Sequence, residues 1–246
     1  MIKRIKKIIF MNKKERKYLI RKKFNLSIDS QTLIDYLVFK GITIGKGTIF
    51  HDPENIFVDI QRPWMVSIGE YCKITRGVIV LAHDYSRSVL RRKYNEIIGE
   101  CKKTIIGNNV FIGMNSIILM GTQIGDNCII GAGSVVSGKF EDNVVIAGNP
   151  AKVICTLDQY YARRKSKYIE EAKLYVREYY NKYNILPKKN EMSAFFPLFL
   201  ERNEDAIKDI WTAWSGDEEE EIIQSFFDSS PMFKDYDDFV TAALHE

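Results

Sequence analysis

The sequence has little histidine and little cysteine. It contains 3 histidines and 4 cysteines among 246 residues, and no two cysteines form a C-x-x-C pair. Zinc sites and disulfide frameworks are built from closely spaced residues of these types, so the sequence predicts neither. Few, scattered cysteines fit a reduced, cytoplasmic protein. They are Cys72, Cys101, Cys128 and Cys155.

Long apolar runs are also missing. No stretch approaches the roughly 18 apolar residues that a membrane-spanning helix needs. The basic start of the chain is not followed by the apolar core of a signal peptide. The net charge of +4 is too small to indicate nucleic-acid binding by itself. With 46% apolar and 28% charged residues, the composition is that of an ordinary globular protein.

What the sequence does contain is a repeat of six residues. Steps of six from Ile44 reach Val80, and steps of six from Ile106 reach Val136. Every position of the second series is β-branched, and glycine often follows the anchors. Neither a helix nor a simple strand has this period. The anchors are Ile44, Phe50, Ile56, Arg62, Ile68, Ile74 and Val80, then Ile106, Ile112, Ile118, Ile124, Ile130 and Val136.

This repeat predicts flat strands joined by tight turns around a narrow prism. The branched anchors would fill its inside, and the small residues four positions later, such as Cys72 and Cys128, would pack beside them. The glycine after each anchor would permit a backbone conformation that a side chain forbids. Because one coil cannot bury its inner face alone, the coils must stack. We therefore expect a mainly β fold, a parallel β-helix over residues 41–156.

An insertion separates the two series, because Val80 and Ile106 are not a multiple of six apart. It covers residues 82–103 and carries six basic side chains. Long excursions from a regular solenoid are usually functional. His83 stands at its root, and an imidazole is well suited to take a proton near neutral pH. We predict His83 as a general base, ahead of His51 in a turn-like segment and His245 near the last residue.

Three segments resemble the hexapeptide-repeat acetyltransferases. They are I-I-G-N-N-V-F-I-G at 105–113, I-G-D-N-C-I-I-G-A-G-S-V-V at 124–136 and A-G-N-P-A-K at 147–152. In appearance they are most similar to the maltose, galactoside and xenobiotic O-acetyltransferases and to acyltransferases of bacterial surface-polysaccharide gene clusters. The resemblance covers about residues 42–156. It implies a left-handed β-helix, acetyl-CoA as the acyl donor without a metal, and a homotrimer with active sites in the clefts between subunits.

The resemblance also implies roles for individual residues. His83 matches the family's catalytic histidine, which acts as general base on the acceptor hydroxyl. Met114, Ala132 and Ser137 match positions whose backbone groups hold acetyl-CoA, although Met114 replaces a small polar residue common in relatives. Lys152 matches a basic position near the nucleotide end of CoA.

Two further residues are candidates for binding the acceptor. Asn55 falls where galactoside-type enzymes carry an acceptor-binding asparagine. Asp84 follows His83 where the sugar-acetylating branch often has proline, a departure that bears on the acceptor and not on the chemistry.

These features predict transfer of an acetyl group from acetyl-CoA to a hydroxyl of a small carbohydrate. Two alternatives stay open: N-acetylation of an amino-sugar at the same site, and a non-catalytic β-helix scaffold whose C-terminal extension binds a protein. A zinc enzyme on the same scaffold is disfavoured, because three scattered histidines do not supply the usual set of ligands.

The flanks lie outside the repeat. Residues 1–40 form a basic, helical N-terminal segment with eleven Lys or Arg and one acid between Lys3 and Lys23. We interpret it as a solvated helical face, with weak contact to an anionic membrane surface as the second possibility and nucleic acid as the last. Residues 157–246 form a C-terminal helical extension. It begins with a helix from Asp158 to about Tyr183, whose tyrosine stripe we expect to pack on the β-helix, and continues with about three short helices.

Overall fold

The computed structural model describes residues 12–24, 26–208 and 219–245. The chain divides into two compact units, Met1–Tyr160 and Tyr161–Glu246. Within the described ranges, no helix combines the length and the apolar character needed to cross a membrane.

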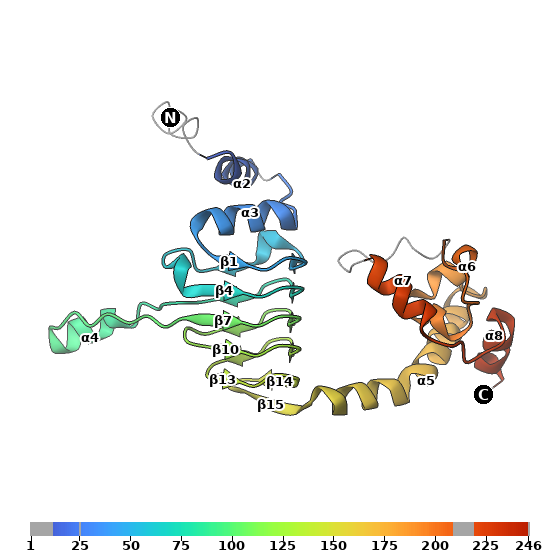
Figure 1. The fold of residues 1–246 in the computed structure, drawn as a ribbon. Helices are drawn as coiled ribbons and strands as arrows, with labels where there is room; N and C mark the ends of the chain where they lie inside the picture. The colour runs from blue at the N-terminus through green and yellow to red at the C-terminus, as the bar shows by residue number, and fades with distance from the viewer. Residues whose placement is uncertain (1–11, 25, 209–218, 246) are drawn as a thin grey trace. The chain divides into compact units, whose positions relative to one another are not determined.

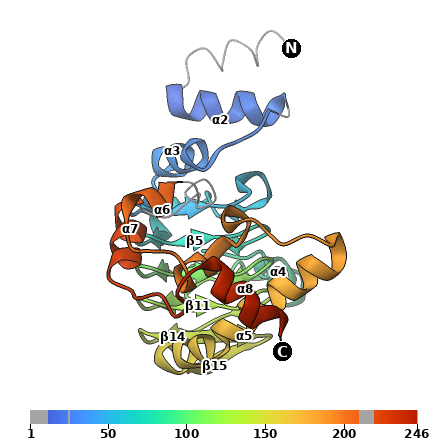
Figure 2. The same cartoon turned by 90° about the vertical axis from the view of Figure 1, so that its right-hand side faces the viewer.

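The first unit is a left-handed β-helix of short strands that form three stacked sheets (Figures 1 and 2). Each full coil contributes one strand to each sheet, and neighbouring coils pair in parallel. Sheet 1 contains β1 (Thr43–Ile44), β4 (Val66–Ile68), β7 (Thr104–Ile106), β10 (Gln123–Ile124) and β13 (Lys139–Phe140). Sheet 2 contains β2 (Ile49–Phe50), β5 (Lys73–Ile74), β8 (Phe111–Ile112), β11 (Ile129–Ile130), β14 (Val144–Gly148) and the antiparallel β15 (Ala151–Thr156). Sheet 3 contains β3 (Phe57–Val58), β6 (Ile79–Val80), β9 (Ile117–Ile118) and β12 (Val135–Val136).

Three columns of turns join the sheets, and we number them by the sheet that they leave. Corner 1 follows sheet 1 and comprises residues 45–48, 69–72, 107–110, 125–128 and 141–143. Corner 2 follows sheet 2 and comprises residues 51–56, 75–78, 113–116 and 131–134. Corner 3 follows sheet 3 and comprises residues 59–65, 81–103, 119–122 and 137–138.

The predicted anchors fill the prism in the regular coils. All six anchors from Ile106 to Val136 are buried, as are the small residues Cys72 and Cys128 beside them. The first coil differs from the prediction. Its third anchor is Val58, which pairs with Val80 in sheet 3 and is 6% exposed, whereas Ile56 ends a short 3-10 turn, η1 (Pro53–Asn55). The six-residue frame was therefore wrong between Phe50 and Ile68, because this coil contains longer corners.

The glycines after the anchors are required by the close approach of neighbouring coils, and not, as predicted, by a special backbone conformation. A Cβ added to Gly107 would lie 2.5 Å from Oδ1 of Asp126 and 2.6 Å from the carbonyl oxygen of Gly125 in the next coil. The close approach of coils thus requires glycine there, and its φ is not positive. The left-handed conformation occurs three residues after the anchor, as at Asn109 and Asn127 (φ 52° and 55°). Asparagine tolerates this conformation better than most residues.

Two helices cover the first coil. Helix α3 (Ser30–Lys40) starts with Asp29 as N-cap and buries Leu33 and Leu37 in the core of the β-helix. Helix α2 (Lys13–Lys23) lies on α3, with the ring of Tyr18 stacked 4.0 Å from that of Tyr36 (Figure 1). The strands β1, β2 and β3 would otherwise expose their unpaired edges here, so the helices close this end of the solenoid.

The insertion leaves the prism at corner 3 after β6 and returns at β7. It extends away from the stack (Figure 1), and an eight-residue helix that the sequence did not predict, α4 (Arg87–Tyr94), lies within it. Several apolar side chains of the insertion are exposed, namely Tyr85, Val89, Tyr94, Ile97 and Ile98.

The second unit has its own hydrophobic core. It comprises most of α5 (Leu157–Tyr183), the 3-10 turns η3 (Lys189–Glu191) and η4 (Ser193–Leu198), and the helices α6 (Glu204–Lys208), α7 (Glu219–Phe227) and α8 (Tyr236–Leu244). Helix α5 matches its predicted bounds within one residue. Two tyrosines of the stripe that we expected to pack on the β-helix contact residues of the second unit itself. Tyr168 and Tyr175 donate hydrogen bonds to Ala194 and Glu191, because α5 packs against the aromatic C-terminal segment.

Candidate active site

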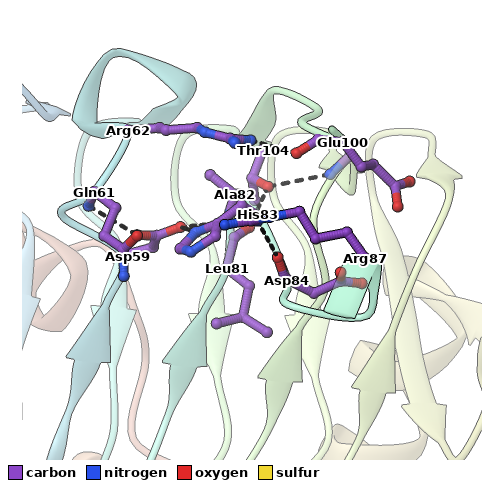
Figure 3. Close-up of polar contacts among 11 residues, drawn as sticks. Asp59, Gln61, Arg62, Leu81, Ala82, His83, Asp84, Arg87, Glu100 and Thr104 are labelled. Atoms are coloured by element: carbon purple, nitrogen blue, oxygen red, sulfur yellow. Dashed lines mark hydrogen bonds and ion pairs between the residues drawn. The ribbon is translucent and has the colours of Figure 1, made fainter. Parts of the chain in front are cut away.

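Corner 3 brings Asp59 and His83 together. Asp59 directly follows β3, and the segment from Leu81 to His83 directly follows β6, the next strand of sheet 3. Val58 pairs with Val80 in sheet 3, so Asp59 lies beside Leu81 of the next coil, two residues before His83. The side chains of Asp59 and His83 therefore meet although 24 residues separate them. Nδ1 of His83 and Oδ2 of Asp59 form a short contact (Figure 3).

The carboxylate of Asp59 is buried and fully engaged. Its side chain is 1% exposed. It accepts hydrogen bonds from the backbone N–H of Gln61 (2.9 Å) and of Ala82 (3.2 Å) in addition to its contact with His83. Burial by itself would raise the pKa of Asp59, but the hydrogen bonds from Gln61, His83 and Ala82 outweigh it and hold the pKa below the usual value. Asp59 is therefore an anion around which this corner is built.

This contact fixes the orientation of the imidazole. A carboxylate can only accept, so Nδ1 of His83 carries the proton and Nε2 has the free lone pair. The His83 side chain is 15% exposed, so Nε2 is the ring nitrogen available to an incoming molecule. A histidine held in this tautomer can remove a proton from a hydroxyl group.

The root of the insertion is closed beneath His83. The hydroxyl of Thr104, at the start of β7, donates to the carbonyl oxygen of Leu81 (2.6 Å) and accepts from the backbone N–H of Gly121 (3.3 Å). The guanidinium of Arg62 binds the carbonyl oxygen of Glu100 on the returning segment (Figure 3). The position of His83 is thus fixed from both ends of the insertion.

Asp84 has a local structural contact. Its Oδ1 accepts from the backbone N–H (3.0 Å) and the hydroxyl (2.7 Å) of Ser86, which leads the chain into α4. These hydrogen bonds from Ser86 lower the pKa of the exposed Asp84 carboxyl. Arg87 lies over the ring of Tyr85, 4.5 Å from its centroid. An acceptor-binding role of Asp84 stays a prediction.

The predicted acetyl-CoA positions lie at two corners and on β15. Met114 and Ala132 lie exposed at corner 2, above one another in successive coils, whereas Ser137 lies at corner 3 below His83. Lys152 lies exposed on β15, opposite Ala147.

Asn55 also lies at corner 2. Its amide donates to both carboxylate oxygens of Asp52 (2.9 and 2.8 Å), which is paired with Arg76 (3.2 Å).

One chain does not bring the two corners together. Ala132 and Ser137 stand on either side of β12, so an extended strand separates them by roughly 16 Å at about 3.3 Å per residue. Sheet 3 lies between all residues of corner 2 and all residues of corner 3. The predicted catalytic histidine and two of the four predicted acetyl-CoA positions, Met114 and Ala132, therefore occupy opposite edges of one face of the prism.

The comparisons with known proteins agree with this architecture. The family model described as "Hexapeptide repeat of succinyl-transferase" matches residues 103–137. The chain is 44% identical to Protein CapG of Staphylococcus aureus over 129 residues, which cover 52% of this chain and 69% of CapG. The chain belongs to the hexapeptide-repeat acyltransferases. It is 34% identical over 130 residues to the putative acetyltransferase YvoF of Bacillus subtilis, covering 53% of this chain and 69% of that protein.

A further member of the hexapeptide-repeat acyltransferases, galactoside O-acetyltransferase of Escherichia coli, is 45% identical over 120 residues. That match covers 49% of this chain and 57% of the relative. The predicted family and enzyme class are confirmed: the chain is an acyltransferase. The matches cover about half of the chain, and the substrates belong to the proposal below.

Asp59 is a candidate site residue that the six-residue pattern did not predict. The frame of six placed Asp59 inside a repeat, between Ile56 and Arg62, and so hid its position directly after an anchor. A signal was present: V-D at 58–59 and V-L-A-H at 80–83 each begin with the last residue of a strand, and these two residues pair in sheet 3. Trp64 was missed as well. It lies in η2 (Pro63–Met65) at corner 3, and it is 68% exposed.

Within the described ranges, His, Cys, Asp and Glu side chains form no group of three or more that could hold a metal ion. The buried thiols of Cys72 and Cys128 have raised pKa values because burial disfavours the thiolate. They fill space in the core beside the branched anchors, as predicted.

Proposed function

We propose that the protein transfers an acetyl group from acetyl-CoA to a hydroxyl group of a carbohydrate, with His83 as the general base. The observation that carries this proposal is the pairing of His83 with the buried carboxylate of Asp59 at the root of the insertion. The carboxylate leaves Nε2 of His83 as the proton acceptor, on a histidine that the hexapeptide-repeat family uses for this step.

One group, Nε2 of His83, is enough to accept and return the proton that moves during the reaction. Nε2 of His83 takes the proton of the acceptor hydroxyl as its oxygen forms a bond to the thioester carbonyl carbon. The carbon–sulfur bond then breaks, and the leaving thiolate takes the proton back from Nε2. The products are an acetyl ester and the free thiol of CoA. The anionic Asp59 stabilises the imidazolium that exists between these steps.

Corner 2 suits the acyl donor. At Gly133, between the Ala132 and Ser134 positions, an added Cβ would meet no atom within 4 Å, so the backbone of this turn is open to a ligand. Pantetheine amides can bind such exposed backbone groups, which supports the roles proposed for Met114 and Ala132. Lys152 and the basic side chains of the insertion would pair with the phosphates of CoA. The basic side chains of the insertion are Arg87, Arg91, Arg92, Lys93, Lys102 and Lys103.

A complete site needs two chains. Corner 3 of one subunit would meet corner 2 of its neighbour, so that His83 faces the donor held by Met114 and Ala132. Three subunits related by a three-fold axis make this contact three times and close the ring, which gives a homotrimer. The projecting insertion, with exposed Tyr85 and Val89, supports this arrangement, because a neighbouring subunit would cover its apolar side chains.

The carbohydrate acceptor is supported by the exposed ring of Trp64. It lies at corner 3, in the coil that also supplies Asp59. An exposed indole offers the flat apolar surface on which a sugar ring can stack. Gln61, also exposed at this corner, offers an amide for hydroxyl groups. Asn55 and Asp84 are the further candidates for hydrogen bonds to the acceptor.

The test is acceptor-dependent release of CoA thiol, measured over a panel of sugars, amino-sugars and nucleotide sugars. We expect release with a hydroxyl acceptor, and a loss on the order of 10²–10⁴-fold in turnover for His83→Ala. His245→Ala is the matched control, since His245 is an exposed residue at the end of α8 in the second unit, and should retain activity. Wild-type turnover in His83→Ala would exclude this base. Release with amino-sugars alone would indicate N-acetylation, and the absence of any stabilisation by acetyl-CoA would indicate a scaffold.

A further inference from the structure

Helix α2 carries a basic stripe on the face that points away from α3. Lys13, Arg16, Lys17 and Ile20 stand at positions i, i+3, i+4 and i+7, and all four line one groove. No residue of α2 is buried. The helix therefore contributes a solvent-facing surface, in contrast to α3, whose side chains enter the core.

The acidic neighbours of α2 are largely engaged elsewhere. Its single acid, Glu15, pairs with Lys40 of α3. Asp35 pairs with Lys14 (2.9 Å), on the side of the helix that faces α3. Asp29 approaches Lys17 only to 4.0 Å, and its carboxylate accepts from the backbone of Thr32 as the N-cap of α3.

The stripe thus keeps an excess of positive charge. Among the described residues, no acidic partner contacts Lys13 or Arg16.

Exposed apolar side chains continue the stripe. Phe24, four residues after Ile20, caps the helix and is 64% exposed, and Leu26 is 49% exposed. The ammonium of Lys23 lies 5.5 Å from the centre of the Phe24 ring. A row of cations next to an exposed aromatic ring suits a lipid surface, which has anionic headgroups outside and apolar acyl chains beneath them. Nucleic acid would pair with the cations but offers no such layer for Phe24 and Leu26.

We propose that the outer face of α2, formed by Lys13, Arg16, Lys17, Ile20 and Phe24, binds an anionic lipid surface. The cations lie at the level of the phosphates, and Phe24 and Leu26 enter the boundary of the acyl chains. Within the first unit, α2 lies at the end of the coil stack remote from β15 (Figure 1). The face thereby orients the solenoid end-on to the membrane.

Assembly strengthens this contact. In the trimer proposed above, the three-fold axis is parallel to the direction in which the coils of each subunit stack. All three α2 helices therefore lie at the same end. Three weak contacts to one surface then act together. This multiplication rests on the proposed trimer, whereas the assignment of the α2 face does not.

The experiment is sedimentation of the full-length chain with vesicles of phosphatidylcholine alone or with about one third phosphatidylglycerol. We expect binding to the anionic vesicles only, and weaker binding as salt rises from about 0.05 M to 0.5 M. Removing one surface cation weakens binding by roughly fivefold. The triple variant Lys13→Gln, Arg16→Gln, Lys17→Gln should therefore bind on the order of 100-fold more weakly, at unchanged acetyl transfer to a soluble acceptor.

The controls separate charge from position. The triple variant Lys165→Gln, Lys167→Gln, Lys182→Gln removes the same charge from exposed positions of α5 and should bind as the wild type does. Phe24→Ala should weaken binding without a change in charge. Wild-type binding by the α2 triple variant would overturn the proposal, as would equal binding to both vesicle types. Binding of a DNA duplex in preference to the vesicles would assign the stripe to nucleic acid instead.

Discussion

Asp59 and His83 form a buried carboxylate–imidazole contact between two successive coils of the β-helix. Neither residue lies on a strand. Both follow strands of sheet 3, and the parallel pairing of β3 with β6 places them against each other. The regular stack of the solenoid thereby supplies the precision that the irregular corner needs.

Replacing Asp59 with Asn tests its positioning role. The amide cannot stabilise an imidazolium, and it favours the opposite tautomer of His83. We expect turnover to fall by about 10²-fold or more with little change in KM for acetyl-CoA, because corner 2 is untouched. Steady-state kinetics of Asp59→Asn and Asp59→Glu separate the roles. Restored turnover in the Glu variant supports orientation by a carboxylate, and equal kinetics of Asn and wild type would contradict it.

The lowered pKa of Asp59 predicts a pH dependence of stability. A carboxyl whose folded pKa lies below its unfolded value, about 3.9, stabilises the protein above that value. This contribution is lost as the pH falls through the folded pKa. The wild type should therefore exceed Asp59→Asn in free energy of unfolding near neutral pH, where Asp59 is ionised. The difference should shrink below about pH 4, where the protonated acid resembles the amide. Denaturant titrations at a series of pH values measure it, and a difference that grows in acid would be opposite in sign.

A shared site predicts complementation between inactive chains. His83→Ala removes the base, and Ala132→Trp blocks the donor corner with an exposed bulky side chain. Each variant alone should be inactive. Co-refolded one to one, they form mixed trimers in which about one quarter of the sites combine an intact His83 with an intact corner 2. Recovered activity of this order, with a mass of three chains by light scattering, supports the assembly. Complete inactivity of a mixture that does form trimers would place the site within one chain.

The two hydrophobic cores predict two separable unfolding transitions. Phe199 is 2% exposed and stacks 5.2 Å from Phe239 in the second unit, whereas Ile130 is fully buried in the β-helix. Phe199→Ala should cost about 3–5 kcal/mol and Ile130→Ala about 2–5 kcal/mol. Calorimetry should show each variant lowering a different transition. A single transition that both variants lower equally would mean that the two units unfold together.

The regular part of the fold could be predicted because the sequence repeats it. From Ile106 to Val136 every coil has the same length, so each anchor could be assigned to the core and each small residue to its side. The first coil could not be assigned in this way. Its corners are longer, and the periodic frame is restored only at Ile68, which concealed the shift from Ile56 to Val58. Asp59 lies within that shift, so its contact with His83 depends on a register that only the structure gives.

Packing partners were harder to predict than elements. Helix α5 could be predicted from the apolar periodicity of its sequence. The stripe of tyrosines, however, does not indicate which surface it packs against. The hydroxyl of Tyr168 donates a hydrogen bond to the carbonyl oxygen of Ala194, because the C-terminal residues form a core of their own. Helix α4 was also missed, since its eight residues lie within an excursion that was interpreted as a loop.

The closure of the insertion by Thr104 has a consequence for how this enzyme can diverge. Because Thr104 binds Leu81 directly, the coils above and below are joined as if the residues between were absent. The cost of a longer loop on a closed root grows slowly, by about 0.6 kcal/mol for each doubling of length. The insertion can therefore be lengthened, shortened or exchanged while Asp59 and His83 keep their places. New acceptors can in this way be tried on an unchanged Asp59–His83 pair.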